Sequence, residues 1–409
     1  MSNQQLTKTK GSKFLFLDGL RGLAALYVMI GHARWLLWEG YQNFTTHPDN
    51  YSHFDKALMY FFSFFKWGHE FVLLFFVLSG FVIHYSYSTK LKDNQNAKLN
   101  FTQYFYRRAK RIYPPFLLAL LLTFLLDWTG RVMNYSIYNG TSPYELMNVH
   151  IGNTPHDAKT LVGNVLFLYK DFVPIFGTNG PTWSLKFEWW FYVFYPAFLL
   201  ISRKHIYYAS SLITLLYSVS FFPQYWPYEL LQEVFGSMIC WWLGVLLAEV
   251  CTKRVQLKLL SSSIVAFCCF LILTPFNAKA NVYDLQIAFL FTSALGILLC
   301  LNEKHYSLKF LDRLKPLGDF SYTLYIIHFP ILTFISGAVM QASGNVLPSH
   351  SYFIISGILI CLAVAYLLHF IVEVPFTKKP TNTTKQRPFF SDGVKVIRSY
   401  TTSKQSRMN

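Results

Sequence analysis

Apolar windows long enough to cross a lipid bilayer recur along almost the whole sequence. A bilayer core of about 30 Å needs roughly 20 apolar residues in an α-helix. The 409 residues are 53% hydrophobic, and only 14% of them are charged, which is too apolar for a soluble domain of this size. The sequence therefore predicts an all-α fold, a polytopic membrane helical bundle, and not a soluble domain with a membrane anchor.

The apolar windows predict about ten transmembrane helices. They cover residues 14–38, 68–88, 112–128, 184–202, 205–222, 230–250, 257–276, 285–301, 319–340 and 351–373. The segment 161–176 is apolar but short, and it contains Lys170, Asp171 and Pro174. We therefore expect this segment to lie at the membrane surface or to re-enter the membrane without crossing it.

The charges of the loops predict how the bundle is oriented. The segment 89–111 holds seven lysines and arginines against the single acid Asp93, and every second loop after it is also basic. The opposite loops, such as 39–66 and 129–183, have few basic residues and nearly balanced charge. Because basic loops are retained in the cytoplasm, both termini are expected on the cytoplasmic side.

This orientation divides the chain into three parts. Residues 1–13 form a cytoplasmic N-terminal segment, 14–376 the transmembrane domain, and 377–409 a basic cytoplasmic tail that is disordered or lies on anionic lipid. The net charge of +16 follows from the basic loops and the tail, so it indicates orientation in a membrane, and no nucleic acid partner is expected. The six cysteines have neither metal nor disulfide spacing, and we expect no metal.

Three ionisable residues lie in the first expected helix, where charges are costly and by default mark a function. Arg21 and His32 are eleven residues apart, which places them on one helix face, roughly 16 Å apart along the axis. Asp18 precedes Arg21 by three residues and is placed to hold its guanidinium. A neutral imidazole is a natural general base for a hydroxyl. The alternative is that His32 only bonds another helix and Arg21 snorkels inward.

A basic run directly precedes the third expected span. Arg108 and Arg111 would project together from one helical turn at the cytoplasmic surface. Phosphate groups of a nucleotide-like donor would pair with them there. The alternative is that the basic run is only a stop-transfer anchor, which keeps this end of the span in the cytoplasm.

An aromatic segment with one acid begins the fourth expected span, at its outer end. Glu188 follows Trp183 and Ser184 by about one helical turn, and its carboxylate is suited to orienting His32 or binding a sugar hydroxyl. The alternative is an ordinary interfacial aromatic belt, with Glu188 paired to Lys186 or exposed. His328, in the ninth expected span, fits a core position as well as a catalytic one.

Taken together, these segments resemble the type-3 membrane acyltransferase family, the bacterial integral-membrane O-acyltransferases of surface polysaccharides. The match runs from residue 14 to about 376, and its motifs occur in order. They are Arg21 followed by His32 within 17–32, then the segments 74–81, 108–114, 183–192 and 321–328.

The resemblance implies an acyl-coenzyme A donor, usually acetyl-CoA, bound from the cytoplasm. It also implies an acceptor hydroxyl of a carbohydrate or glycolipid on the outer side of the bacterial cytoplasmic (inner) membrane. Residue chemistry and the resemblance together assign catalysis to His32, Arg21, Asp18 and Glu188, coenzyme binding to Arg108 and Arg111, and substrate contact to Trp183, Ser184 and His328.

Two features of the prediction are left open at this point. Many members of the family carry an outer hydrolase-like domain; we expect this chain to lack one, which makes a separate outer-side transferase a candidate partner. The main alternative function is a transporter or flippase, in which the stripe of Asp18, Arg21 and His32 relays protons or escorts a polar substrate. A non-enzymatic membrane scaffold explains the clustered charges least well.

Overall fold

The computed structural model describes residues 14–94 and 100–377 as a helical bundle. Within these residues the chain forms no β-strand; only an isolated bridge joins Tyr169 and Val173. The predicted cytoplasmic segment 1–13 and the tail from 378 lie outside the described residues. The all-helical membrane architecture expected from the apolar windows is confirmed.

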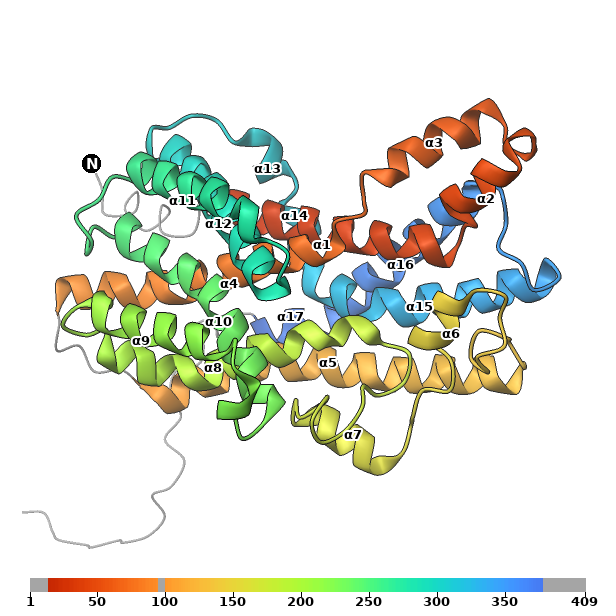
Figure 1. Cartoon of the computed structure of the whole chain (residues 1–409), viewed down its shortest axis with the longest axis horizontal. Coiled ribbons are helices and arrows are strands. Elements are labelled where there is room, and N and C mark those ends of the chain that lie inside the picture. Colours follow the sequence, from red (N-terminus) through yellow and green to blue (C-terminus); the bar gives the residue numbers. More distant parts are fainter. Residues whose placement is uncertain (1–13, 95–99, 378–409) are drawn as a thin grey trace, which may run out of the picture.

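Eight helices in the described part of the chain are long and apolar enough to cross a membrane. In Figure 1 several of them run along the longest axis of the molecule, and others are tilted against it. They are α1 (Leu15–Leu36), α4 (Gly68–Asp93), α5 (Phe101–Val132), α10 (Glu229–Cys251), α11 (Leu259–Leu273) with the 3₁₀ turn that continues it to Phe276, α12 (Ala280–Glu303), α15 (Ser321–Ala342) and α16 (Tyr352–Val372) with the short helix that continues it to Phe376.

The remaining helices are shorter. The α-helices are α2 (Gly40–Thr46), α3 (His53–Ser63), α6 (Glu145–His150), α7 (Ala158–Val165), α8 (Trp183–Ile201), α9 (Ile206–Val219), α13 (Lys309–Arg313), α14 (Lys315–Asp319) and α17 (Val374–Thr377). The 3₁₀ turns are η1 (Pro48–Asn50), η2 (Gly180–Thr182), η3 (Pro223–Tyr225) and η4 (Thr274–Phe276).

Two of the ten expected spans, α8 and α9, are not among the eight helices of spanning length and composition. α9 has 14 residues, and at 1.5 Å per residue it is about 21 Å long, which is less than a bilayer core. α8 has 19 residues but carries Lys186 and Glu188. The segment 161–176 forms no spanning helix; it contains the end of α7 and irregular chain.

Helix α5 begins earlier than the sequence predicted. The side chain of Asn100 accepts a hydrogen bond of 2.8 Å from the backbone N–H of Gln103, which caps the free N–H groups of a helix start. The helix therefore starts at Phe101 and not at 112. As a result Arg108 and Arg111 lie within the same long helix as the expected span 112–128.

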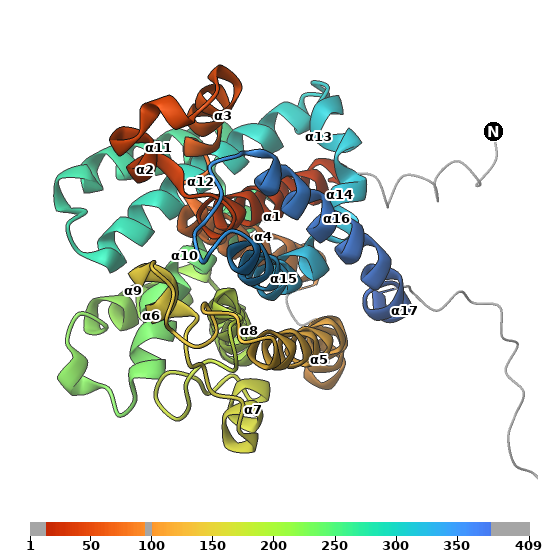
Figure 2. The ribbon, with the colours of Figure 1, turned by 90° about the vertical axis from the view of Figure 1, so that its right-hand side faces the viewer.

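The burial of the helices separates a central core from lipid-facing helices. In the most apolar window of α15, 78% of the residues are buried, against 17% for α11. Large apolar side chains such as Ile272 and Leu367 are each 65% exposed, as expected for surfaces that contact lipid. Figure 2, which looks along the bundle, places α1, α4 and α15 at its centre.

Close packing fixes α4 against α10. A Cβ atom added to Gly80 would lie 2.0 Å from the carbonyl oxygen of Trp241, and one added to Gly244 would lie 2.0 Å from that of Val77. Since only glycine allows backbones to approach so closely, α4 has one position relative to α10. This contact holds in place the helix that supplies Ser79 to the cavity described below.

The chain between α5 and α8 returns into the bundle. The buried carboxylate of Asp127 on α5 accepts hydrogen bonds from the backbone N–H and hydroxyl of Thr178, at 2.8 and 2.7 Å. The amide of Asn179 donates to the carbonyl oxygen of Ile326, in α15, at 2.8 Å. α8 therefore begins beside the last third of α5 and the second turn of α15.

The orientation is tested by cysteine labelling in a variant that lacks the native cysteines. We expect single cysteines placed in 89–94, 252–258 and 302–316 to react only after the cytoplasmic face is exposed. Cysteines in 44–66 and 133–157 should react in intact cells, because loop charge predicts that these segments lie outside. Labelling of 89–94 from the outside would overturn the orientation and, with it, a cytoplasmic donor.

Candidate active site

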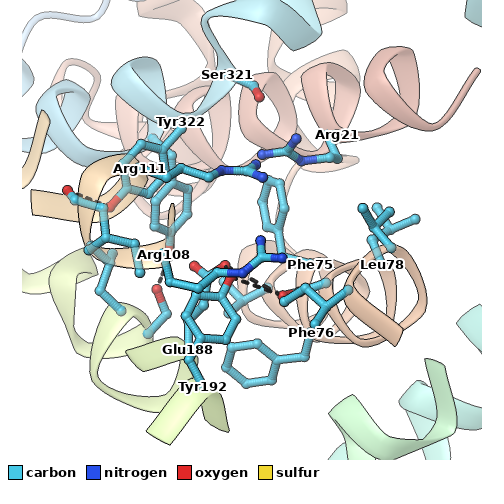
Figure 3. A pocket seen from close by; sticks show the side chains of 18 residues that line it. Arg21, Phe75, Phe76, Leu78, Arg108, Arg111, Glu188, Tyr192, Ser321 and Tyr322 are labelled. Atoms are coloured by element: carbon cyan, nitrogen blue, oxygen red, sulfur yellow. Dashed lines mark hydrogen bonds between the residues drawn. The ribbon is translucent and has the colours of Figure 1, made fainter. Parts of the chain in front are cut away.

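A cavity of about 70 Å³ lies between α1, α4, α5, α8 and α15. Figure 3 shows arginine side chains from two of these helices pointing into it. Five side chains in its wall carry charge or belong to the predicted site. They are Arg21, Arg108, Arg111, Ser184 and Glu188.

The three arginines give the cavity an excess of positive charge. Arg21 is held only loosely by Asp18, with 3.9 Å between Nη1 and Oδ1. Arg108 lies over the rings of Tyr104 and Tyr192, at 5.6 and 5.5 Å from their centroids, and its buried Nε has no hydrogen-bond partner in the described structure. Buried guanidinium groups need anionic or hydrogen-bonding partners, so this wall is suited to an anionic ligand.

Glu188 supplies the acidic group of the cavity. Its carboxylate accepts a short hydrogen bond from the hydroxyl of Tyr192, and the Ser79 hydroxyl lies 3.2 Å from that of Tyr192. Lys186 pairs with Glu233 instead, at 2.7 Å. The alternative in which Lys186 neutralises Glu188 is therefore wrong, and Glu188 faces the cavity.

The relative depth of the motifs differs from the sequence-based prediction. The arginines of α5 were expected at the cytoplasmic surface and Glu188 near the outer end of its span, yet Arg108, Arg111 and Glu188 line the same cavity. The reason is that the segment before α8 folds inward to α15 through Asn179, while α5 extends its arginines into the bundle.

A histidine pair lies outside this cavity. Nδ1 of His32 is 2.9 Å from Nε2 of His328, and Nδ1 of His328 is 3.1 Å from the carbonyl oxygen of Leu324. A carbonyl oxygen only accepts, so His328 carries its proton on Nδ1 and, when neutral, offers a lone pair at Nε2. His32 then donates from Nδ1, which leaves its Nε2 with the lone pair of a base.

Tyr325 connects the histidine pair to the cavity. Its ring is 5.9 Å from that of His328, and its hydroxyl is 2.8 Å from the hydroxyl of Ser184; both Tyr325 and Ser184 line the cavity. The structure thus relates His32 to His328, and not to Glu188. Trp183 does not line the cavity, because its ring stacks on His69 at 5.6 Å.

Sequence reasoning gave no role to Ser79 or to the tyrosines of the site. Ser79, Tyr192, Tyr322 and Tyr325 all line the cavity. Each lies within one of the motif segments 74–81, 183–192 and 321–328, so the motifs contained the signal. The chain has 27 tyrosines, and nothing in composition or spacing distinguishes these three from the rest.

The comparison with protein families identifies the group to which this architecture belongs. A family model described as an acyltransferase domain matches residues 14–370. The chain belongs to the type-3 acyltransferase family. The expected family resemblance is confirmed, and it covers the helices that line the cavity and the histidine pair.

Three named relatives share this region. The chain is 23% identical over 362 residues to the peptidoglycan O-acetyltransferase OatA of Listeria monocytogenes, which is 81% of this chain and 51% of that protein. It is 24% identical to the putative peptidoglycan O-acetyltransferase YrhL of Bacillus subtilis, over 77% of this chain and 51% of that protein. The acyltransferase MdmB of Streptomyces mycarofaciens is 25% identical, over 74% and 79% of the two chains.

The match thus spans about half the length of the first two of these relatives. No solved structure matches the chain. The identities support membership of an acyltransferase family and leave the substrates of this chain to be argued from its own site.

Proposed function

We propose that this chain is a membrane O-acyltransferase that moves an acyl group, acetyl in the first instance, from cytoplasmic acyl-CoA to a hydroxyl of a carbohydrate or glycolipid on the outer side of the cytoplasmic membrane. One observation carries the proposal. A continuous series of contacts leads from a cavity with three arginines, through Tyr325 and His328, to a base at His32. Two of the relatives are named as acetyltransferases of peptidoglycan, a carbohydrate polymer.

The donor is assigned to the arginine cavity on grounds of charge. Coenzyme A carries phosphate groups, for which arginine is the preferred partner. The volume of about 70 Å³ is below the roughly 300–1,000 Å³ of sites that enclose a drug-sized ligand. In this proposal the cavity therefore encloses only part of the donor: its arginines hold phosphate groups of the coenzyme, the acyl end points toward Tyr325, and the rest of the nucleotide lies toward the cytoplasm.

His32 acts as the general base. Its Nε2 removes the proton of an acceptor hydroxyl as the oxygen attacks the thioester carbonyl carbon. The carbon–sulfur bond then breaks, and the departing thiolate of coenzyme A takes a proton back from the His32 imidazolium. His328 holds His32 in the tautomer that leaves Nε2 free, and the Asp18–Arg21 pair supports the positive wall of the donor site.

A relayed transfer differs from this direct one in its intermediate. In the relay the acyl group first bonds to the protein, or passes to a separate outer-side transferase, before it reaches the acceptor. Mixing donor and purified protein without acceptor would then leave a stoichiometric acyl label on the chain. Direct transfer leaves no such label.

The test of the function uses full-length protein in sealed liposomes. Acetyl-CoA labelled in the acetyl group is supplied on the face that carries the basic loops, and glycan acceptors are supplied on the other face. The proposal expects labelled ester on the acceptor and free coenzyme A on the donor side. Movement of unmodified substrate without ester formation would instead identify a transporter.

A further inference from the structure

A second and larger cavity lies at the opposite end of α1 from the arginines. Its volume is about 840 Å³, within the range of roughly 300–1,000 Å³ typical of ligand sites. The end of α1 and the chain after it form one wall, and α3 and the start of α6 form others. Figure 2 looks onto the end of the molecule where α2, α3 and α6 lie. The charge of the loops predicts that this end lies outside the membrane.

We propose that this outer cavity is the acceptor site and that it binds a neutral or amino-bearing carbohydrate chain. The assignment rests on the proposed acyl transfer for its chemistry. The identity of the ligand is argued from the lining, the rigidity and the position of the cavity.

The lining combines aromatic faces with a few charged groups. Trp35, Trp38, Tyr60 and Tyr144 contribute rings. Sugar rings expose C–H groups on their faces and hydroxyls at their edges, so they stack on aromatic side chains while bonding to polar groups beside them. An alkyl chain would gain from the rings but would desolvate the charged groups beside them without offering them a hydrogen bond.

The charges of the two cavities have opposite sign. The inner cavity holds three arginines against Glu188, whereas the outer cavity holds Arg34 against Glu39 and Glu145. Phosphate groups are therefore attracted to the inner cavity and repelled from the outer one. This difference assigns the phosphorylated donor to one end of α1 and a ligand rich in hydroxyl groups to the other.

Hydrogen bonds to neighbouring segments fix the aromatic wall. Trp38 donates from Nε1 to the carbonyl oxygen of Ser349 at 2.8 Å, and the hydroxyl of Tyr144 accepts from the backbone N–H of Leu347 at 2.8 Å. Tyr51 donates to Glu39 at 2.6 Å. Burial raises the pKa of Tyr51, and the neighbouring Glu39 raises it further, so this hydroxyl stays a donor at neutral pH.

Asp55 ties the α3 wall to the chain before α16. Its carboxylate accepts from the backbone N–H and the hydroxyl of Ser351, at 3.0 and 2.6 Å. Burial alone would raise the pKa of Asp55, but hydrogen bonds from Ser351 and Ser52 outweigh it and bring the pKa to about 2. Because this pKa is lowered, the stabilisation is complete above the unfolded value of about 4 and is lost only as the pH falls toward 2. The wall is therefore formed at any physiological pH.

The inner end of the cavity adjoins the proposed base. Trp35 lines the cavity, and its ring centroid is 6.4 Å from that of His32, one helical turn earlier. Phe329 lies against both rings, at 5.1 Å from His32 and 5.9 Å from Trp35. A hydroxyl of a chain seated against Trp35 would approach His32 from the outer side, while the donor approaches the histidine pair from the inner side.

The experiment uses the full chain in nanodiscs, with neutral and amino-bearing oligosaccharides as probes. The glycan is varied at fixed acetyl-CoA to obtain the acceptor KM, and acetyl-CoA is varied at fixed glycan to obtain the donor KM. Tyr60→Ala and Trp35→Ala each remove one stacking face, and we expect the acceptor KM to rise about tenfold while the donor KM stays within twofold. Tyr225→Ala is the matched control, because Tyr225 is an exposed tyrosine at 70% outside both cavities. Its acceptor KM should equal that of the wild type.

A second readout separates this inference from the proposed function. Equilibrium binding of the same glycans without donor should weaken by the same factor in Tyr60→Ala and Trp35→Ala. Glycan binding without any acyl transfer would reject the enzymatic function and leave the acceptor site standing. Acyl transfer with unaltered glycan binding and acceptor KM in both variants would overturn the acceptor site, as would transfer to lipid acceptors alone.

Discussion

Replacing His32 with alanine is expected to abolish acyl transfer while the protein still inserts and folds. Loss of a positioned general base typically lowers a rate by about 100- to 10,000-fold. The change makes α1 more apolar, so insertion should not suffer. The measurement is the initial rate of ester formation at saturating donor and acceptor, with thermal unfolding in detergent as the check on folding.

His305→Ala provides the matched control for this variant, since His305 is exposed in the loop between α12 and α13. Its transfer rate should equal that of the wild type. Full transfer activity in a folded His32→Ala protein would remove the catalytic assignment, and the base would then have to be sought at Glu188, which faces the inner cavity.

The geometry also says which second residue should be coupled to His32. The sequence suggested Arg21, because the two share one face of α1. In the structure His32 is hydrogen-bonded to His328, whereas Arg21 lines the inner cavity. Effects of residues that act as a unit are far from additive. Changing both His32 and His328 should therefore lower the transfer rate little more than changing His32 alone. For His32 and Arg21, the combined loss of rate should be closer to the sum of the two single effects, expressed as free energies.

The sequence was most informative at charges that occur inside apolar windows. Arg21 and Glu188 were identifiable for that reason, since such groups are rare in membrane helices, and both line the inner cavity. The expected span 112–128 is shorter than α5, because the cap at Asn100 begins one continuous helix that already includes the basic run.

The features that the sequence did not reveal depend on segments far apart in the chain. The depth of α8 follows from the hydrogen bond between Asn179 and the Ile326 carbonyl, which no local pattern encodes. The outer cavity combines residues from 34–40, 59–63 and 143–147 with Leu347. Its tryptophans and tyrosines individually match an interfacial aromatic belt, so only their arrangement around one space suggests a ligand.

Removing both Arg108 and Arg111 is expected to raise the donor KM far more than it lowers saturated turnover. Charge-assisted hydrogen bonds to phosphate typically contribute about 1.5–3 kcal/mol each, so the loss of two corresponds to a rise of roughly 100-fold or more in the KM for acetyl-CoA. Lysine at both positions should restore binding only in part, because it keeps the charge without the planar fork of donors. Initial rates over a range of acetyl-CoA concentrations provide the measurement.

Arg107→Ala distinguishes binding from orientation in the membrane. Arg107 is in the same basic run but is exposed and does not line the cavity. If the run acts only as a stop-transfer anchor, Arg107 contributes to it as much as its neighbours do, and all the variants should share the same unchanged donor KM once inserted. If the cavity binds the donor, Arg107→Ala should behave as the wild type, and only the changes at Arg108 and Arg111 should weaken binding. The buried Nε of Arg108, which has no hydrogen-bond partner in the described structure, favours the second outcome, because such a group gains most from a ligand that supplies the missing acceptor.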